Sequence, residues 1–145
     1  MRDEMHSAIA TRLRRIGQRY TSKRRSLVDA LDAVGNPPTI PEILAGNAEL
    51  ATSSVYRNLA VLEQAGVVHR IVTHDEFARY ELAEDLTERH HHHLICTACG
   101  GVQDFTPSPQ LEQSAARALS RIARQAEFTV SGHRIDVVGL CNRCA

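Results

Sequence analysis

The chain has 145 residues, 43% of them hydrophobic, a size and composition that suit one globular core or two small ones. No apolar run approaches the length of a membrane span, and residues 1–10 hold no apolar segment long enough for a signal peptide. We therefore expect a cytoplasmic protein with no membrane association. The net charge is zero, but residues 1–25 carry eight basic and two acidic side chains. This asymmetry indicates either a phosphate-attracting surface or a solvated helix face.

Caps and stops in the first half predict three helices, over about residues 4–16, 22–34 and 39–45. Gly17 ends the first helix, and Thr21 or Ser22 can cap the second. Thr39 and Glu42 have the spacing of a capping box and open the third.

A fourth helix is predicted from Thr52, which we expect to cap it, to Gly66, which ends it. Its apolar residues recur at helical spacing and face inward. Its first turn is expected to turn Ser54, Tyr56 and Arg57 outward. The plainer interpretation of Tyr56 and Arg57 is the polar face of an ordinary amphipathic helix.

Two β-rich runs follow, residues 67–72 and 77–82, joined by the polar turn 73–76, and together they predict a hairpin. Helices followed by a hairpin form the order of a winged helix-turn-helix, in which the helix beginning at residue 52 enters a DNA major groove. The basic N-terminal segment favours double-stranded operator DNA as the partner.

The second half predicts a small α/β unit. Strands are expected at residues 101–105, 128–130 and 134–138, with a helix from Pro109, capped by Ser108, to about residue 126. The fold class is therefore α+β, with a winged-helix DNA-binding domain (1–83), a polar hinge (84–89) and a dimerisation and metal-binding domain (90–145). Because the second core is thin, we expect metal and homodimer formation to reinforce it.

All four cysteines lie in two Cys-x-x-Cys pairs, Cys96 with Cys99 and Cys141 with Cys144. Two such turns supply the four corners of a tetrahedral site, so the pattern predicts structural Zn2+. Redox dithiols would need only one pair beside a thioredoxin-like turn, and disulfides would need an oxidising compartment.

Taken together, these motifs resemble the ferric uptake regulator family, which includes iron, zinc, manganese and peroxide regulators. The resemblance covers nearly the whole chain and rests on residues 13–21 (LRRIGQRYT), 54–59 (SVYRNL), 62–68 (LEQAGVV) and 90–100 (HHHHLICTACG), with the closing cysteine pair. It implies a homodimeric repressor in which metal at a sensory site between the domains sets the spacing of two DNA-binding heads over a palindromic operator.

The resemblance also implies the metal ligands. A sensory site would use His69, Glu81, His91 and His93. A further site would use five other residues, His90, His92, Asp104, Glu112 and His133. Alternate residues of a strand share one face, which favours two sites over one. Each histidine could instead be an ordinary surface or hydrogen-bonded imidazole.

Two departures from the family pattern bear on the metal. Residues 37–39 (PPT) stand where iron-sensing relatives place a histidine, and Ala83 stands where zinc-sensing relatives often place a cysteine. Three imidazoles and a carboxylate suit Zn2+, which we favour, but would also accept Fe2+ or Mn2+. Peroxide sensing by an iron-loaded form is a further alternative.

The predicted DNA contacts divide by chemistry. Tyr56 and Arg57 would lie near base edges, and phosphate contacts would come from Arg19, Tyr20, Thr52 and Ser54. A metal-storage or chaperone protein would not need this DNA-binding half. A zinc deaminase would need an open metal position and a Pro before its cysteine pair, and Ile95 and Leu140 stand there instead. We therefore expect neither an enzyme nor a site for a small organic substrate.

Overall fold

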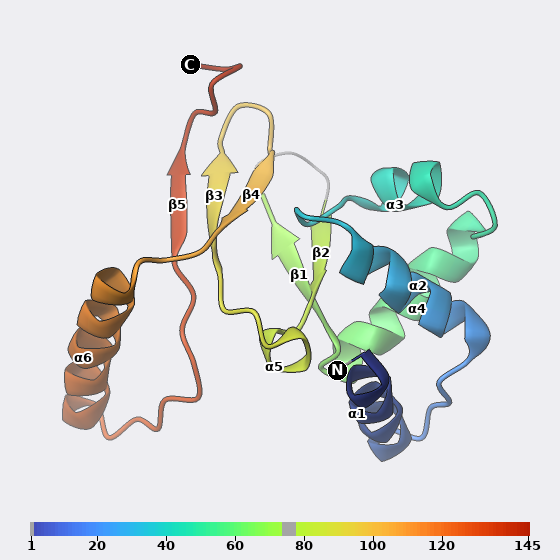
Figure 1. The fold of residues 1–145 in the computed structure, drawn as a ribbon, viewed down its shortest axis with the longest axis horizontal. Coiled ribbons are helices and arrows are strands. Elements are labelled where there is room, and N and C mark those ends of the chain that lie inside the picture. The colour runs from blue at the N-terminus through green and yellow to red at the C-terminus, as the bar shows by residue number, and fades with distance from the viewer. Residues whose placement is uncertain (1, 74–77) are drawn as a thin grey trace.

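The computed structural model of the protein describes residues 2–73 and 78–145. An N-terminal half of helices and one hairpin stands beside a C-terminal half built on a three-stranded sheet (Figure 1). The elements in chain order are α1 (Arg2–Arg15), α2 (Ser22–Ala33), α3 (Ile40–Gly46), α4 (Thr52–Gln64), β1 (Val68–Val72), β2 (Ala78–Leu82), α5 (Glu84–Thr87), β3 (His92–Cys96), β4 (Val102–Phe105), α6 (Pro109–Gln125) and β5 (Asp136–Gly139). This is the predicted α+β fold.

The N-terminal helices begin and end close to where their caps predicted. The Thr21 hydroxyl accepts a hydrogen bond from the backbone N–H of Arg24 at the start of α2. Both bonds of the Thr39–Glu42 capping box are present at the start of α3. The predicted cap of α4 is wrong, because Thr52 is the first helical residue and Ala51 before it offers no side-chain cap.

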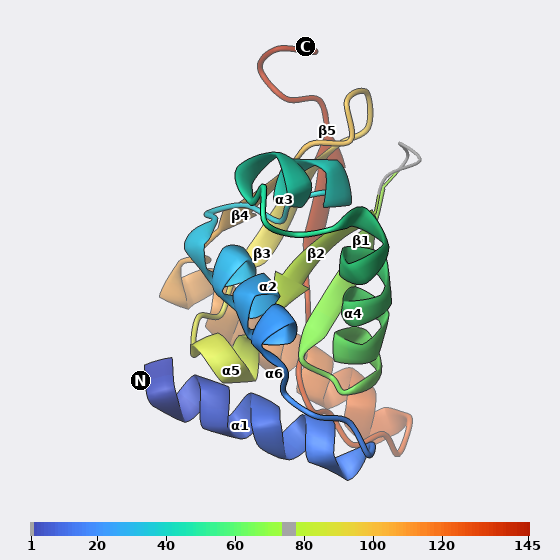
Figure 2. The ribbon, with the colours of Figure 1, turned by 90° about the vertical axis from the view of Figure 1, so that its right-hand side faces the viewer.

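The hairpin β1–β2 follows α4, and α4 lies beside β1 and contacts α3 (Figure 2). The two strands are antiparallel, with His69 opposite Glu81. Thr39 extends the pairing through an isolated bridge to Arg79. Residues 74–77, which include most of the predicted turn and the predicted strand start at Phe77, lie outside the described residues.

One hydrophobic core fills the N-terminal half, joining α1 through α4 to the hairpin. Its most deeply buried members are Ile9, Leu13, Val28, Leu59 and Leu62. Leu86 of α5 belongs to the same core, so the segment expected to be a hinge packs against the helices. The predicted domain boundaries and the hinge itself remain predictions.

The C-terminal sheet has the strand order β4-β3-β5, with β3 antiparallel to β4 and parallel to β5. Helix α6 lies on the side of this sheet away from α1–α4 (Figure 1). Ser108 caps α6, as predicted. The predicted strand at residues 128–130 is wrong: this stretch has no ladder partner in the described chain, and pairing begins only at Asp136.

The C-terminal half leaves much apolar surface uncovered within a single chain. Ile122 of α6 is 60% exposed and Phe128 is 70% exposed, and Val138 of β5 and Leu140 after it are also exposed. Among the described residues, the buried hydrophobic cluster that includes this half is small and joins Ile71 of β1 to Ile95 and Val102 of the sheet. In the described part of the chain, no helix has the length and apolar character needed to cross a membrane.

Candidate metal centres and DNA-facing helix

The four cysteines converge at one end of the C-terminal sheet, because β3 and β5 run parallel and each leads into one Cys-x-x-Cys turn. Their sulfur atoms lie within 4.8 Å of one another, and Cys99 Sγ is 3.9 Å from Cys141 Sγ. We call this group the cysteine cluster. The backbone N–H groups of Cys141 and Cys99 point at Cys96 Sγ and lower the pKa of Cys96 to about 6. A thiolate is the form that binds metal, so this geometry fits structural zinc.

A second group, the central cluster, consists of Glu81, His91, His93 and Asp104. Glu81 comes from the hairpin strand β2, whereas the other three come from β3, β4 and the residue before β3. Glu81 Oε2 lies 2.8 Å from His91 Nε2 and 3.1 Å from His93 Nε2. Asp104 lies on the other side, with carboxylate oxygens 3.6 and 3.7 Å from the same two nitrogens. The cluster therefore joins the two halves of the chain.

In both histidines of the central cluster, the ring nitrogen that faces away from Glu81 has a partner of its own. His91 Nδ1 donates to the Arg89 carbonyl oxygen at 3.1 Å, and His93 Nδ1 lies 3.1 Å from Asp136 Oδ1. A proton on Nδ1 leaves the Nε2 lone pair free for a metal, and such outer hydrogen bonds also raise ligand basicity. His93 is 0% exposed, so its ring has little freedom to turn away.

The charges in the central cluster stabilise one another. Burial alone would raise the pKa of Glu81, but hydrogen bonds from His93 and His91 outweigh it and hold that pKa below its ordinary value. Burial opposes protonation of both histidines, yet the hydrogen bond to Glu81 raises the pKa of each. Burial raises the pKa of Asp104. A divalent cation can replace the protons that this group attracts.

A third group, the α6 cluster, consists of His90, His92, Glu112 and His133. Glu112 Oε1 is 2.7 Å from His90 Nε2 and 2.5 Å from His133 Nε2, and its Oε2 is 3.0 Å from His92 Nε2. Glu84 of α5 lies behind His90, with Oε2 2.9 Å from Nδ1. The Ile135 backbone N–H donates to His92 Nδ1 and fixes that ring.

Two buried atoms show that both clusters suit an ion. Among the described residues, the buried side-chain nitrogen and oxygen atoms without a hydrogen-bond partner are Asp104 Oδ1 in the central cluster and His133 Nε2 in the α6 cluster. His133 Nε2 is close to Glu112 but not in hydrogen-bonding geometry. Buried ligand atoms that lack a hydrogen-bond partner and face other ligand atoms are what a metal site presents before it is filled.

The structure separates the histidines by alternation, as predicted, with His91 and His93 in one cluster and His90 and His92 in the other. Two other groupings differ from the expectation. Asp104, expected in the further site, lies in the central cluster, because its β4 position is opposite His93. His69, expected in the sensory site, is exposed and its imidazole is not in the group, although its backbone pairs with Glu81.

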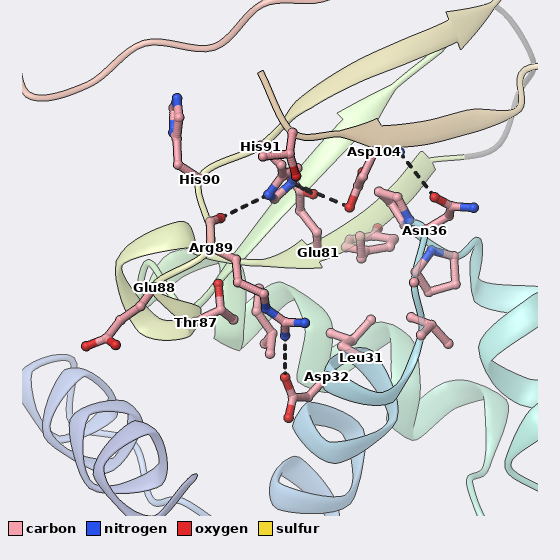
Figure 3. A pocket seen from close by; sticks show the side chains of 17 residues that line it. Leu31, Asp32, Asn36, Glu81, Thr87, Glu88, Arg89, His90, His91 and Asp104 are labelled. Carbon is pink, nitrogen blue, oxygen red and sulfur yellow. Dashed lines mark hydrogen bonds and ion pairs between the residues drawn. The ribbon is translucent and has the colours of Figure 1, made fainter. Parts of the chain in front are cut away.

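A pocket of about 460 Å³ opens beside the central cluster, between the loop after α2 and the segment before β3 (Figure 3). Asn36 Oδ1 accepts a hydrogen bond from the Asp104 backbone N–H at 3.1 Å. Across the pocket, Arg89 forms an ion pair with Asp32 at 2.9 Å. The N-terminal half thus contacts a member of the central cluster through Asn36.

The N-terminal part of α4 presents both predicted base-contacting residues to solvent. Tyr56 is 57% exposed and Arg57 is also exposed, and the predicted phosphate contacts Arg19 and Thr52 are exposed as well. The outward orientation predicted for Ser54 is wrong. Ser54 is 8% exposed, and its hydroxyl accepts a hydrogen bond from Asn58 at 3.0 Å.

Tyr20 was also predicted to contact phosphate, but its hydroxyl already has a partner within the protein. Its hydroxyl lies 2.6 Å from His6 Nδ1, and the other ring nitrogen of His6 lies 3.2 Å from Asp29. Burial raises the pKa of Tyr20 to about 12. The phenol therefore ties α1 to the start of α2.

Sequence reasoning missed several supporting residues, namely Asn36, Arg79, Glu84 and Asp136. Long sequence separations divide Asn36, Arg79 and Asp136 from their partners, whereas Glu84 lies six residues before His90. No local pattern marks any of the four. The parallel register that places Asp136 against His93 could be inferred only by pairing strands 43 residues apart.

A helix-turn-helix with a hairpin, joined to a sheet that carries three metal-ligand clusters, defines the class of metal-responsive DNA-binding regulators. A model of the ferric uptake regulator family matches residues 15–138. The chain belongs to this family, which confirms the resemblance, and is a transcriptional regulator rather than an enzyme.

Similar proteins include regulators of several kinds. The peroxide-responsive repressor PerR of Staphylococcus aureus is 30% identical over 97% of this chain and 91% of its own length. A solved structure of a zinc-bound manganese uptake regulator is 30% identical, with a TM-score of 0.61, and covers 94% of this chain and 98% of its own. The ferric uptake regulator of Vibrio cholerae is 26% identical, with a TM-score of 0.66, and covers 89% and 96%.

Proposed function

We propose that the protein is a repressor of metal-uptake genes that binds palindromic operator DNA as a homodimer when its central cluster holds a metal ion. The observation that carries this proposal is the 2.8 Å approach of Glu81 in β2 to His91 before β3. A metal held by both residues binds only when the N-terminal half is positioned against the C-terminal sheet. Metal therefore selects that arrangement, and the arrangement sets where α4 lies.

Zinc remains the metal that we favour, with Fe2+ or Mn2+ as the alternative. The central cluster offers two imidazoles and two carboxylates, a harder donor set than the three imidazoles and one carboxylate expected. His69 is the cross-strand neighbour of Glu81, so a rotation of its exposed side chain would bring a third imidazole towards the cluster. Which metal the central cluster prefers thus depends on whether the His69 imidazole becomes one of its ligands. An iron-loaded form that senses peroxide is a second alternative, in line with the named relative of Staphylococcus aureus.

The cysteine cluster would hold structural Zn2+, because four thiolates leave no exchangeable position for sensing. The α6 cluster would take a further divalent ion between α6 and the β3 region. The exposed apolar face of α6, with Phe128 and Val138, would be covered by a second copy of the chain. We place the protein in the cytoplasm with its DNA.

The test is operator binding by protein that holds only its cysteine-bound zinc. The operator is first selected from random double-stranded DNA, and binding is then titrated with buffered Zn2+, Fe2+ and Mn2+, anaerobically and in separate experiments. We expect one metal to switch binding on within its cellular range. His91→Ala should abolish the response, and His69→Ala should abolish it only if zinc is the metal sensed. Equal binding with and without every metal would exclude metal sensing.

A further inference from the structure

Arg79 is a buried cation where the two halves of the chain meet. It lies on β2 and is 9% exposed, whereas Arg70 on the neighbouring strand is half exposed. Burying a guanidinium is costly unless fixed partners receive its hydrogen bonds. The partners of the Arg79 side chain therefore indicate its structural role.

One partner belongs to the cysteine-cluster turn. Arg79 Nε donates to the Gly100 carbonyl oxygen at 2.8 Å. Gly100 is buried, has a φ of +72°, and donates its own N–H to the Cys96 carbonyl oxygen, so it closes the first Cys-x-x-Cys turn. A residue with a side chain is disfavoured at this φ. The acceptor is thus part of a rigid turn, and zinc on the cysteines would hold it more firmly still.

A second partner belongs to the helix-turn-helix. Arg79 Nη1 lies 3.5 Å from Glu42 Oε1, while Glu42 Oε2 accepts the Thr39 backbone N–H in the capping box of α3. The backbone makes the same connection, since Thr39 is bridged to Arg79 and the Tyr80 N–H donates to the Pro38 carbonyl oxygen. Helix α3 in turn contacts α4, which carries Tyr56 and Arg57.

From these contacts we infer that Arg79 is a positioning residue that fastens the DNA-binding half to the cysteine-cluster turn, and so sets how much metal the central cluster needs to switch DNA binding on. The inference rests on the proposed function. We call the contacts of Arg79 with Gly100 and Glu42 the latch. The latch favours the same arrangement of the two halves that the sensory metal selects, and it does so even when that metal is absent. When only a fraction of molecules is in the binding-competent arrangement, the apparent metal affinity equals the intrinsic affinity multiplied by that fraction.

Arg79→Gln tests the latch, because glutamine is polar but uncharged and is too short to contact both Gly100 and Glu42. In full-length protein with zinc on the cysteines, we expect the midpoint for operator binding, titrated in parallel with buffered Zn2+ and Mn2+, to rise by about tenfold, within the usual range for coupled sites. Operator affinity at saturating metal should stay near the wild-type value. Without sensory metal, small-angle scattering should show a larger radius of gyration for Arg79→Gln than for wild type.

Arg70→Gln is the matched control, since Arg70 lies on the same hairpin and pairs with Glu63 of the same half. It should leave both the midpoint and the scattering unchanged. Structural zinc content and the melting temperature show whether each variant is folded. An unshifted midpoint or an unchanged radius of gyration in folded, zinc-loaded Arg79→Gln overturns the inference.

Two milder variants carry the test if Arg79→Gln fails to fold. Arg79→Lys keeps the charge, but a single ammonium cannot span Gly100 and Glu42, so an intermediate shift is expected. Glu42→Gln keeps the capping box, which accepts Gln at this position, and removes the negative partner. An unshifted midpoint in both overturns the inference. If the wild-type protein shows no metal-dependent binding at all, the proposed function fails, and the scattering comparison still tests the latch.

Discussion

His93 and Asp136 lie directly opposite each other on the parallel strands β3 and β5, with Nδ1 and Oδ1 3.1 Å apart. This pair fixes the His93 ring with Nε2 towards Glu81 and Asp104. Asp136 is therefore an outer carboxylate of the central cluster, supplied by the strand that also leads to the second cysteine pair. One strand thus supports both the sensory and the structural site.

Asp136→Ala should weaken metal binding at the central cluster by about 10- to 100-fold, the usual cost of losing an outer partner of a metal-binding histidine. Zinc at the cysteine cluster should be retained, because no cysteine contact changes. The measurement is a competition titration with a chelator that reports both stoichiometry and affinity. Glu49→Ala, which removes an exposed carboxylate from the N-terminal half, is the control. Unaltered affinity in Asp136→Ala would show that His93 needs no outer support.

Ser54 should contribute to the stability of the fold, whereas Thr52, which remains a predicted phosphate contact, should not. Ser54→Ala removes the buried acceptor of Asn58, which also accepts from Arg24 Nε, and should lower the free energy of unfolding by about 1–2 kcal/mol. Thr52→Ala should leave that energy nearly unchanged, because Thr52 is exposed and does not cap α4. Urea denaturation measures both variants. A larger loss for Thr52→Ala would contradict this assignment.

Local chemistry made much of this fold predictable. Caps at Thr21, Thr39 and Ser108 and the two Cys-x-x-Cys turns depend on neighbouring residues, and the structure has them. Alternation along a single strand was enough to separate His91 from His92.

The predictions that were wrong depend on contacts between residues far apart in the sequence. The position of Asp104 follows from the β3–β4 register, and the burial of Ser54 follows from how α4 turns against Arg24. The stretch 128–130 has the composition of a strand but finds no partner in the described chain. Sequence patterns give the type of an element more readily than its neighbours.

Arg57→Ala should reduce discrimination between operator and random DNA, because an exposed guanidinium in the N-terminal part of α4 can contact base edges. A lost bidentate base contact costs about 1–3 kcal/mol of discrimination. Zinc content and the oligomeric state should be unchanged. Fluorescence anisotropy on both DNAs at fixed salt measures the ratio. Equal loss on operator and random DNA would indicate that Arg57 contacts phosphate only.

Cys96→Ser should remove structural zinc and leave a protein that is unfolded or monomeric. Cys96 is buried at the end of β3, and its sulfur accepts backbone N–H groups from both cysteine turns. Without zinc, the thin core of Ile71, Ile95 and Val102 has little to hold the two turns together. Circular dichroism, zinc analysis and light scattering measure the outcome. A stable dimeric variant that still binds DNA would refute a structural role for this site.

The central cluster should make the stability of protein without sensory metal depend on pH in two directions. The pKa values of His91 and His93 are raised by Glu81, so their contribution is complete below the ordinary histidine pKa and is lost as pH rises through the raised values. The pKa of Glu81 is lowered, so its contribution is present above the ordinary glutamate pKa and is lost as pH falls through the lowered value. The stability contributed by Glu81 and the two histidines should therefore be greatest between about pH 4.5 and 6.5, the ordinary pKa values of the two residue types. Urea denaturation across pH measures it, and Glu81→Gln should flatten the alkaline decline. Metal binding should show the opposite trend and strengthen as pH rises, because the ion competes with the same protons. A decline above pH 6.5 that persists unchanged in Glu81→Gln would place its origin in other groups.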